Sequence, residues 1–150
     1  MASNEVGLTV SDTIARSFAL AADTRGPTTA LRHKHLGVWR SVSWSEWLEI
    51  AKDVACGLHA LGFRPGDTAS ILANTMAEWV YADMGVLCAG GVSSGIYPTD
   101  SVRQVEYLVN DSGTSVIFVE DEEQLDKVLE CRERCPKLTR VVVFDMEGLS

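Results

Sequence analysis

The stretch PGDTASILANTMAEWVYADMGVLCAGGVSSGIYP, residues 65–98, decides the fold of this chain. It begins with the turn signal Pro65-Gly66-Asp67, continues with an apolar strand over residues 69–73, and then enters an apolar helix after Asn74. Glycines at 90 and 91 end that helix, and residues 92–97 are expected to form a second buried strand. A strand, a helix and a second strand in this order constitute a βαβ unit.

The same alternation continues to the end of the chain. Strands are predicted over residues 69–73, 92–97, 114–120 and 141–144, and none of them alternates polar with apolar residues, which is typical of strands covered on both faces. The helices between them are predicted to open at Asn74, at Ser101-x-x-Gln104 and at Asp121-x-x-Gln124, because these are N-cap and capping-box patterns. We therefore expect an α/β fold with a parallel sheet, helices on both faces and right-handed crossovers.

The first third of the chain predicts a smaller set of elements. The first is a helix capped by Thr9 or Ser11 and ended by Gly26-Pro27, with Ile14, Phe18, Ala21 and Ala22 on one face. A hairpin follows, with strands over residues 29–34 and 38–43 joined by His35-Leu36-Gly37. The third is an amphipathic helix from the capping box Ser43-x-x-Glu46 to Gly62. The whole chain then reads as a helix and a hairpin followed by a parallel βαβαβαβ sheet.

Composition narrows the class of protein. The chain has 150 residues, 46% apolar and 23% charged, which is typical of one soluble globular domain with a real core. Its net charge of −8 disfavours nucleic acid and anionic lipid as generic partners. Binding of a phosphate group would need a local site such as a glycine-rich loop or a helix N-terminus. Residues 1–9 lack the basic and apolar regions of a signal peptide, and no run approaches the ~20 apolar residues of a membrane span.

The four cysteines do not predict a metal site. Cys56 and Cys88 fall within apolar helical patterns and are expected to behave as small apolar residues. Cys131 and Cys135 are four residues apart near a helix end, and two thiols without further ligands make a poor zinc site. With no CxxC pair present, a reduced, cytoplasmic setting is the prediction.

No catalytic constellation is found either. Gly90-Gly91 through Gly95 are glycine-rich, but they lead from a helix into a strand, whereas a dinucleotide-binding loop leads from a strand into a helix. We therefore expect these glycines to end the helix and allow it to pack closely. His33 and His35 share a strand face, His59 lies near a helix end, and all three are expected at the surface. The acids at 121–123 are expected to complement a helix start.

An ordered series of short motifs nevertheless resembles a known family. The motifs are Trp39-Arg40-Ser41-Val42-Ser43-Trp44, Leu61-Gly62-x-x-Pro65-Gly66-Asp67, Asn74-x-x-Ala77-Glu78-Trp79, Ala89-Gly90-Gly91, Gly95-Ile96-Tyr97-Pro98-Thr99 and the run from Gln104 to Val128. From about Thr9 onward, their order and spacing are similar to AMP-forming acyl-CoA synthetases of the adenylate-forming superfamily. The sequences of residues 96–99 and 120–128 most resemble those of the long-chain and very-long-chain fatty-acid branch.

The resemblance implies a reaction in two halves. A fatty acid carboxylate attacks the α-phosphate of ATP to give an acyl-adenylate and pyrophosphate, and coenzyme A then displaces AMP, with Mg²⁺ offsetting the phosphate charge. It also implies that residues 1–150 are the N-terminal part of an AMP-binding domain, that the catalytic motifs lie downstream, and that this stretch alone is inactive. No catalytic, cofactor-binding or metal residue is therefore predicted here. Fatty acid, ATP and coenzyme A are the expected partners, nucleic acid is not, and peripheral membrane association is an open expectation.

One loop carries two alternative expectations. In shorter-chain relatives, the loop that corresponds to Tyr97-Pro98-Thr99 lies near the coenzyme A nucleotide, and an arginine position falls near Leu125. Here Pro98 and Thr99 replace small glycines, and the alternative is a turn that serves only to cap the next helix. Two rival functions also stay open at this point: another adenylate-forming enzyme, such as an aryl-CoA ligase or a peptide-synthetase adenylation domain, and a stand-alone α/β binding module.

Overall fold

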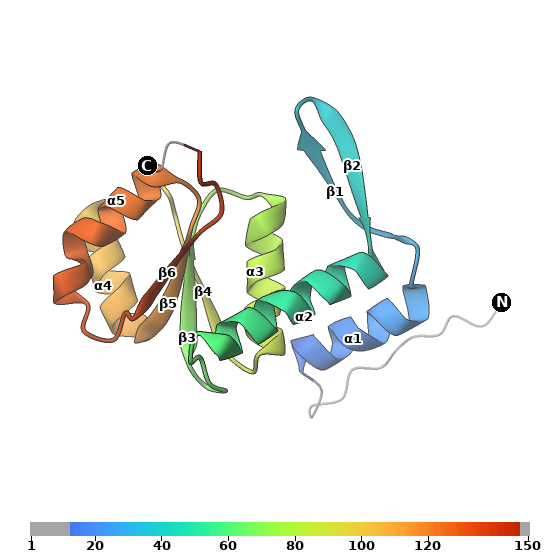
Figure 1. The fold of residues 1–150 in the computed structure, drawn as a ribbon, viewed down its shortest axis with the longest axis horizontal. Helices are drawn as coiled ribbons and strands as arrows, with labels where there is room; N and C mark the ends of the chain where they lie inside the picture. The colour runs from blue at the N-terminus through green and yellow to red at the C-terminus, as the bar shows by residue number, and fades with distance from the viewer. Residues whose placement is uncertain (1–12, 148–150) are drawn as a thin grey trace. The chain divides into compact units, whose positions relative to one another are not determined.

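The computed structural model describes residues 13–147 (Figure 1). The chain divides into two compact units, residues 1–49 and 50–150, and the boundary falls within helix α2, Trp44–Ala60. Each unit is described by itself.

The first unit begins with helix α1, Ile14–Arg25. Its N-cap is Thr13, whose hydroxyl accepts a hydrogen bond from the backbone N–H of Arg16 at 3.2 Å. The prediction of a cap at Thr9 or Ser11 is therefore wrong, and both of those residues lie outside the described part. The predicted apolar face is also narrower than expected, because Phe18 and Ala22 are buried while Ile14 is exposed.

Strands β1, Thr29–His35, and β2, Val38–Ser43, form the predicted antiparallel hairpin. The connection is the two-residue turn Leu36-Gly37, with φ values of 48° and 79°. Two successive residues of positive φ define the type I′ turn, whose twist matches that of the flanking strands. Strand β1 thus runs one residue further than predicted, through His35.

An aromatic cluster forms the core of this unit. The ring of Phe18 lies 4.7 Å from that of Trp47 and 6.3 Å from that of Trp44, which are distances of favourable ring packing. The guanidinium of Arg25 lies 5.1 Å from the ring centroid of Trp44. The predicted capping box at the start of α2 is confirmed, since the N–H and hydroxyl of Ser43 both donate to the Glu46 carboxylate.

The second unit contains a four-stranded parallel sheet with the order β4-β3-β5-β6. Its elements are β3 Thr68–Leu72, α3 Ala77–Cys88, β4 Val92–Ile96, α4 Val102–Ser112, β5 Thr114–Val119, α5 Glu122–Cys131, a short 3₁₀ turn Arg132–Arg134, and β6 Arg140–Val143. The predicted parallel α/β architecture is confirmed, with each strand within two residues of its expected position.

Side chains of the sheet alternate between two cores, one on each face. Ile71 and Phe118 face a core that includes Ala82 and Val86 of α3. Leu72 and Val119 face the opposite core, with residues of α4 and α5 such as Val105, Val109 and Val128. This double coverage explains the absence of polar alternation in β3 and β5. The expectation that β4 and β6 are covered in the same way is wrong, because they lie at the two edges of the sheet, and of their residues only Ile96 is buried.

Helix ends follow the predicted signals in most places. Ser101 and Gln104 form a complete capping box, and Asp121 caps α5 by accepting from the N–H of Gln124.

One apolar expectation is wrong: Cys56 lies on the exposed side of α2 rather than in a core. The neighbouring positions on this side of α2 are also exposed, so the apolar composition of the segment did not show on which side of the helix Cys56 lies.

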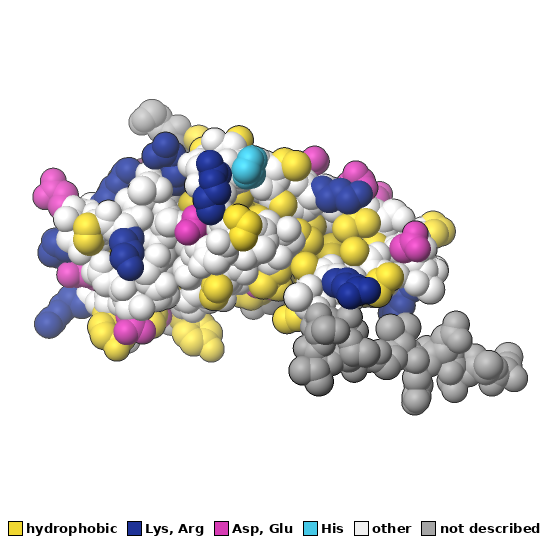
Figure 2. Space-filling model, turned by 90° about the horizontal axis from the view of Figure 1, so that it is seen from below, with side chains coloured by type: hydrophobic (Ala, Val, Ile, Leu, Met, Phe, Trp, Pro, Cys, Tyr) yellow, Lys and Arg dark blue, Asp and Glu magenta, His cyan; other side chains and the backbone are white. Residues whose placement is uncertain are grey.

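The surface mixes charge with apolar side chains. On the face drawn in Figure 2, Lys and Arg lie interspersed with Asp and Glu and with exposed apolar groups. Over residues 13–147, no helix combines the length and apolar character that crossing a membrane requires.

Candidate functional site

The topology of the sheet singles out one position on its carboxyl edge. From β3 the chain crosses to β4 on one side, and from β5 it continues to β6 on the other side. Neighbouring strands β3 and β5 therefore send their connections in opposite directions. In open parallel sheets, the crevice outside such a switch point is the usual position of a ligand site.

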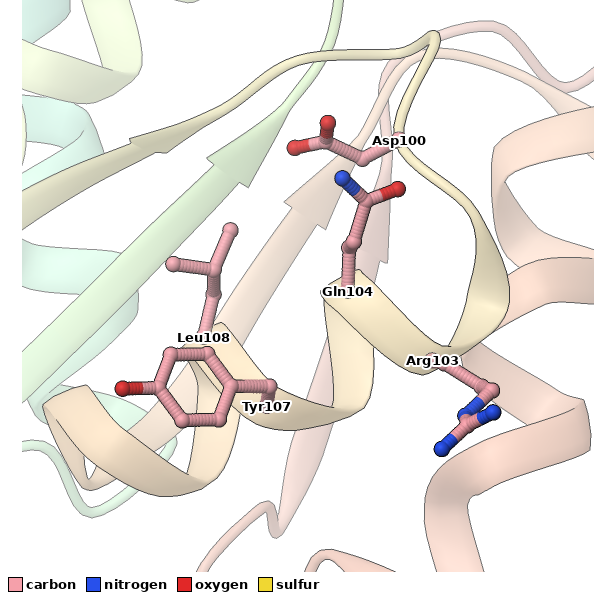
Figure 3. A pocket seen from close by; sticks show the side chains of 5 residues that line it. All are labelled: Asp100, Arg103, Gln104, Tyr107 and Leu108. Atoms are coloured by element: carbon pink, nitrogen blue, oxygen red, sulfur yellow. The ribbon is translucent and has the colours of Figure 1, made fainter.

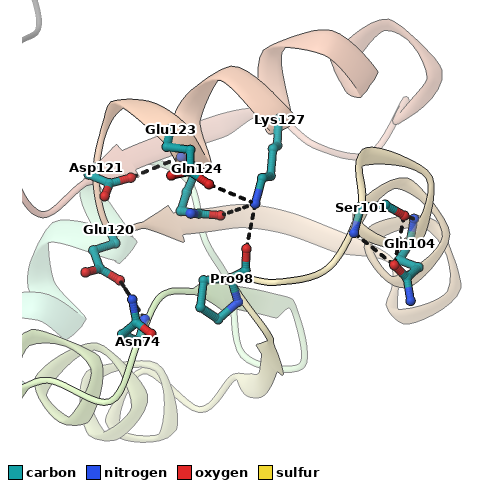
Figure 4. A network of polar contacts seen from close by, with 9 residues as sticks. All are labelled: Asn74, Pro98, Ser101, Gln104, Glu120, Asp121, Glu123, Gln124 and Lys127. Carbon is teal, nitrogen blue, oxygen red and sulfur yellow. Dashed lines mark hydrogen bonds and ion pairs between the residues drawn. The ribbon is translucent and has the colours of Figure 1, made fainter.

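Asn74 and Glu120 meet at this switch point. Each follows the end of its strand closely, and the Glu120 carboxylate accepts from the backbone N–H of Asn74 at 2.6 Å and from its side-chain amide at 2.9 Å. The backbone N–H of Glu120 in turn donates to the carbonyl of Leu72. Figure 4 shows this pair bridging the two strand ends.

The prediction of Asn74 as the cap of the next helix is consequently wrong. Helix α3 begins three residues later, its N-cap is Met76, and no side chain makes a capping hydrogen bond there. The amide of Asn74 is committed to Glu120, which is 46 residues away in the sequence. A charge-assisted tertiary contact is stronger than a neutral local cap, and it determines where Asn74 lies.

A hollow of about 300 Å³ adjoins this pair at the carboxyl ends of β3 and β4. It is lined by Ala73, Asn74, Thr75, Trp79, Gly95, Ile96, Tyr97 and Pro98. A side chain at position 95 would begin 3.5 Å from the Trp79 ring, so glycine keeps the floor of the hollow open. Tyr97 is 77% exposed at its mouth. A lining that combines the aromatic rings of Trp79 and Tyr97 with the polar groups of Asn74 and Thr75 is suited to a flat or apolar group.

The loop beside this hollow is held by a residue of α5 that the sequence reasoning missed. The ammonium group of Lys127 donates to the carbonyl of Pro98 at 2.5 Å and to the side-chain oxygen of Gln124 at 3.1 Å (Figure 4). It also lies 3.4 Å from the Glu123 carboxylate. Lys127 lies two positions after Leu125, near which the arginine position of shorter-chain relatives falls, and it contacts the loop backbone.

The same loop also leads into α4 through an ordered turn. The N–H of Asp100 donates to the carbonyl of Tyr97 at 3.0 Å, and the capping box of Ser101 follows directly. The turn expected to cap the next helix is therefore present. The expected contact of this loop with a coenzyme A nucleotide stays a prediction.

A second hollow of about 410 Å³ lies along α4 (Figure 3). Its lining residues are Asp100, Arg103, Gln104, Tyr107 and Leu108. It is shallow and exposed, and its lining includes one acidic residue, Asp100, one basic residue, Arg103, and Tyr107. Nothing in its arrangement aligns a nucleophile with a base.

The glycines at 90 and 91 have the packing role expected of them. Gly90 has φ of 77°, which favours glycine, and a side chain at Gly91 would lie 2.5 Å from the ring of Phe63. Both therefore allow the α3–β4 connection to pass close to the segment that precedes β3. They do not cradle a phosphate at a helix start.

The other residues considered in the sequence analysis have structural roles or lie in secondary-structure elements. His33 lies opposite Arg40 in the hairpin and His35 opposite Val38. Asp121 caps α5, as expected of an acid at a helix start. Within residues 13–147, no group of three His, Cys, Asp or Glu side chains could hold a metal ion, so no residue of the described chain is assigned to Mg²⁺.

Cys131, the last residue of α5, and Cys135, directly after the 3₁₀ turn, are both buried. Burial, and then the neighbouring Cys135 thiol, raise the pKa of Cys131 to about 11. The pKa of Cys135 is also raised, chiefly by burial. A thiol that remains protonated at neutral pH is a poor nucleophile and a poor metal ligand, so these two side chains act as apolar core residues.

Comparison with known proteins decides the family. The family model described as AMP-binding enzyme matches residues 18–150. The chain belongs to the AMP-binding enzyme family. A human long-chain-fatty-acid–CoA ligase, ACSBG1, is 33% identical over 132 residues, which cover 88% of this chain and 18% of that protein. A Xenopus laevis relative, ACSBG2, is 30% identical over 135 residues and is covered to the same 18%.

Solved structures agree with this membership. The anthranilate CoA ligase AuaEII in complex with anthranoyl-AMP superposes with a TM-score of 0.82 at 25% identity, covering 91% of this AMP-binding family chain and 26% of that one. A Mycobacterium tuberculosis fatty acyl CoA synthetase superposes with a TM-score of 0.77 at 17% identity over 86% of this chain and 26% of its own. The predicted resemblance and fold class are confirmed, and the chain spans about a fifth of the curated relatives it matches.

Proposed function

We propose that residues 1–150 form the N-terminal part of the AMP-binding domain of a long-chain fatty-acid–CoA ligase. The observation that carries the proposal is the 33% identity, over 88% of this chain, to proteins named long-chain-fatty-acid–CoA ligase. The whole protein would join a fatty acid to coenzyme A with ATP, through an acyl-adenylate. In the first half a carboxylate oxygen bonds to the α-phosphorus and pyrophosphate leaves; in the second the thiol bonds to the acyl carbon and AMP leaves.

This chain would contribute positioning to that reaction. The described residues hold no metal cluster and no aligned nucleophile and base, so we assign them no chemical step. Mg²⁺, when bound by the whole enzyme, would offset the charge of the phosphates. The hollow beside Trp79 and the loop anchored by Lys127 would shape one wall of a site, with coenzyme A as the ligand expected near Tyr97–Thr99.

ATP–pyrophosphate exchange tests the proposal. The whole protein that contains this sequence should exchange label in the presence of palmitate and should form palmitoyl-CoA when coenzyme A is added. Residues 1–150 alone should give neither activity. The proposal would be contradicted if no fatty acid supported exchange by the whole protein. Turnover by residues 1–150 alone would also contradict it.

An aryl-acid ligase is the second candidate, because the anthranilate CoA ligase superposes with a TM-score of 0.82. The same assay separates the two. Anthranilate or benzoate in place of palmitate should support exchange only if the aryl reading is correct. A preference for aromatic acids by more than tenfold in kcat/KM would replace the fatty-acid proposal with this one.

We further propose that the whole protein meets its apolar substrate at a membrane surface, as a peripheral protein. A long-chain fatty acid partitions into bilayers because each methylene removed from water is favourable. A ligase that docks on the bilayer would draw on that local supply.

A further inference from the structure

The β1–β2 hairpin has a charge opposite to that of the chain that carries it. Between Thr29 and Ser43 there are three cations, Arg32, Lys34 and Arg40, two histidines and no acidic residue. The rest of the chain has ten Lys and Arg against 21 Asp and Glu, a net charge of −11. Since charge is screened within about 10 Å at 0.1 M salt, the hairpin presents its own local field.

The tip of this basic hairpin is apolar. Leu36 is 90% exposed, Trp39 is 64% exposed and Val38 is 57% exposed. Lys34 lies directly opposite Trp39 in the ladder, with its ammonium 5.3 Å from the ring centroid. The hairpin therefore combines an apolar tip with cations on the strands immediately behind it.

Leu36 is an unfavourable residue for the turn it occupies. It adopts φ of 48°, the left-handed region where leucine is rare. The first central position of a type I′ turn favours Asn, Asp or Gly, which tolerate positive φ. Neither the turn geometry nor burial accounts for an exposed leucine at this position. An apolar surrounding at the tip does account for it, because that surrounding would favour leucine over asparagine.

We propose that the β1–β2 hairpin inserts its tip into the surface of an anionic membrane. Leu36, Val38 and Trp39 would enter the boundary between headgroups and acyl chains, where tryptophan is favoured. Arg32, Lys34 and Arg40 would contact the lipid phosphates. This names the segment for the peripheral association proposed above, and it rests on the hairpin residues and not on ligase activity.

The apolar tip favours a membrane over a nucleic acid. Arginine and lysine bind phosphates of either kind, but a duplex offers no apolar layer for Leu36 and Val38. The strongly negative remainder of the chain opposes a long polyanion and an anionic bilayer alike, so the apolar tip is what distinguishes the two partners. A membrane requires only that the tip reach the headgroups.

Vesicle cosedimentation tests the inference directly on the 150-residue chain. Vesicles of 30% phosphatidylserine in phosphatidylcholine should bind the chain at 0.1 M NaCl, pure phosphatidylcholine should bind it at least tenfold more weakly, and 0.5 M NaCl should weaken the anionic binding. Each basic residue near an anionic surface contributes about fivefold in affinity, so R32Q/K34Q should lose about 25-fold. A K137Q/R140Q control removes two cations outside the hairpin and should bind as the unsubstituted chain does.

Leu36→Asn separates binding from folding. Asparagine suits the positive φ of position 36, so the thermal midpoint should hold or rise while vesicle affinity falls at least fivefold. Leu129→Asn, at an exposed leucine of α5, is the matched control and should leave binding unchanged. Trp39→Phe should remove the vesicle-induced blue shift of tryptophan fluorescence.

Several outcomes would overturn the inference. One is an unsubstituted chain that does not bind anionic vesicles. Another is Leu36→Asn binding them as tightly as leucine does. A third is binding of a DNA duplex that is as tight as the binding of anionic vesicles and that Leu36→Asn does not weaken. That result would assign the hairpin to nucleic acid. Because the assay contains no ATP or coenzyme A, its failure would leave the proposed ligase function untouched.

Discussion

Replacing Lys127 with methionine should loosen the loop beside the candidate site. Methionine keeps the length and the apolar stem of the side chain but removes the ammonium group. That group donates to the Pro98 carbonyl and to Gln124, and it lies 3.4 Å from Glu123. The side chain of Lys127 is only 19% exposed, so water replaces these contacts poorly.

The three contacts contribute unequally. A hydrogen bond from a charged group is worth about 1.5–3 kcal/mol. Gln124 is 96% buried, and leaving its oxygen without a donor costs about 1–3 kcal/mol. The pair with Glu123, whose side chain is 74% exposed, adds at most about 0.5 kcal/mol. Because these contributions overlap, we expect Lys127→Met to lower the free energy of unfolding by about 2–4 kcal/mol.

Urea unfolding followed by circular dichroism measures that loss. Hydrogen exchange at the backbone amides of Tyr97, Thr99 and Asp100 should rise more than exchange within β3 or β5. Lys137→Met, at an exposed lysine beyond α5, is the control and should change stability by less than about 0.5 kcal/mol.

A double substitution distinguishes the buried polar contact from general damage. Gln124→Leu with Lys127→Met removes both partners, which is far less costly than leaving one unpaired. The double variant should therefore recover at least half of the stability lost by Lys127→Met. A loss below about 0.5 kcal/mol for Lys127→Met, or a double variant no better than the single one, would refute the reasoning.

Three further predictions concern other parts of the second unit. Gly85→Ala should destabilise the chain by about 1–3 kcal/mol in urea unfolding, because its methyl group would lie 2.3 Å from the side chain of Val54; Gly85→Ala with Val54→Ala should recover most of that loss. Stability should fall between about pH 9 and pH 11, because the raised pKa of Cys131 keeps its thiol neutral in the folded state while the unfolded thiol ionises first; Cys131→Ala should flatten this dependence in urea midpoints taken at both pH values. Iodoacetamide at pH 8 should alkylate the exposed Cys56 at least tenfold faster than Cys131 or Cys135, read by peptide mass spectrometry, and equal rates would contradict the burial of those two thiols.

Local signals predicted most elements of the fold correctly. The capping boxes at Ser43 and Ser101 and the cap at Asp121 lie where the sequence indicated, because these contacts join residues three apart. The apolar runs predicted strands covered on both faces, and the two cores confirm this for β3 and β5 but not for the edge strands β4 and β6. The order of the strands was not predicted, since it depends on which runs pair across long separations.

The candidate site was harder to predict because its contacts are long-range. Lys127 reaches Pro98 across 29 residues, and nothing in either local pattern indicates the other. Cys56 was predicted to be apolar and buried, and it is exposed. Its helix is amphipathic, but the side of the helix on which one residue lies depends on the elements that pack against it. Local periodicity reports the existence of a face more reliably than the membership of each residue in it.

Asn74 shows how a correct local rule can lose to topology. Asparagine before an apolar helix is a sound cap signal, and at Asn74 it predicted the wrong partner. Asn74 and Glu120 are both polar residues placed just after apolar strands, and in a parallel sheet the carboxyl ends of neighbouring strands meet at one edge. Had β3 and β5 been recognised as neighbours, that placement would have predicted their contact. The polar residue that follows a buried strand is therefore better assigned to the sheet edge first, and to the next helix only when no polar partner follows a neighbouring strand.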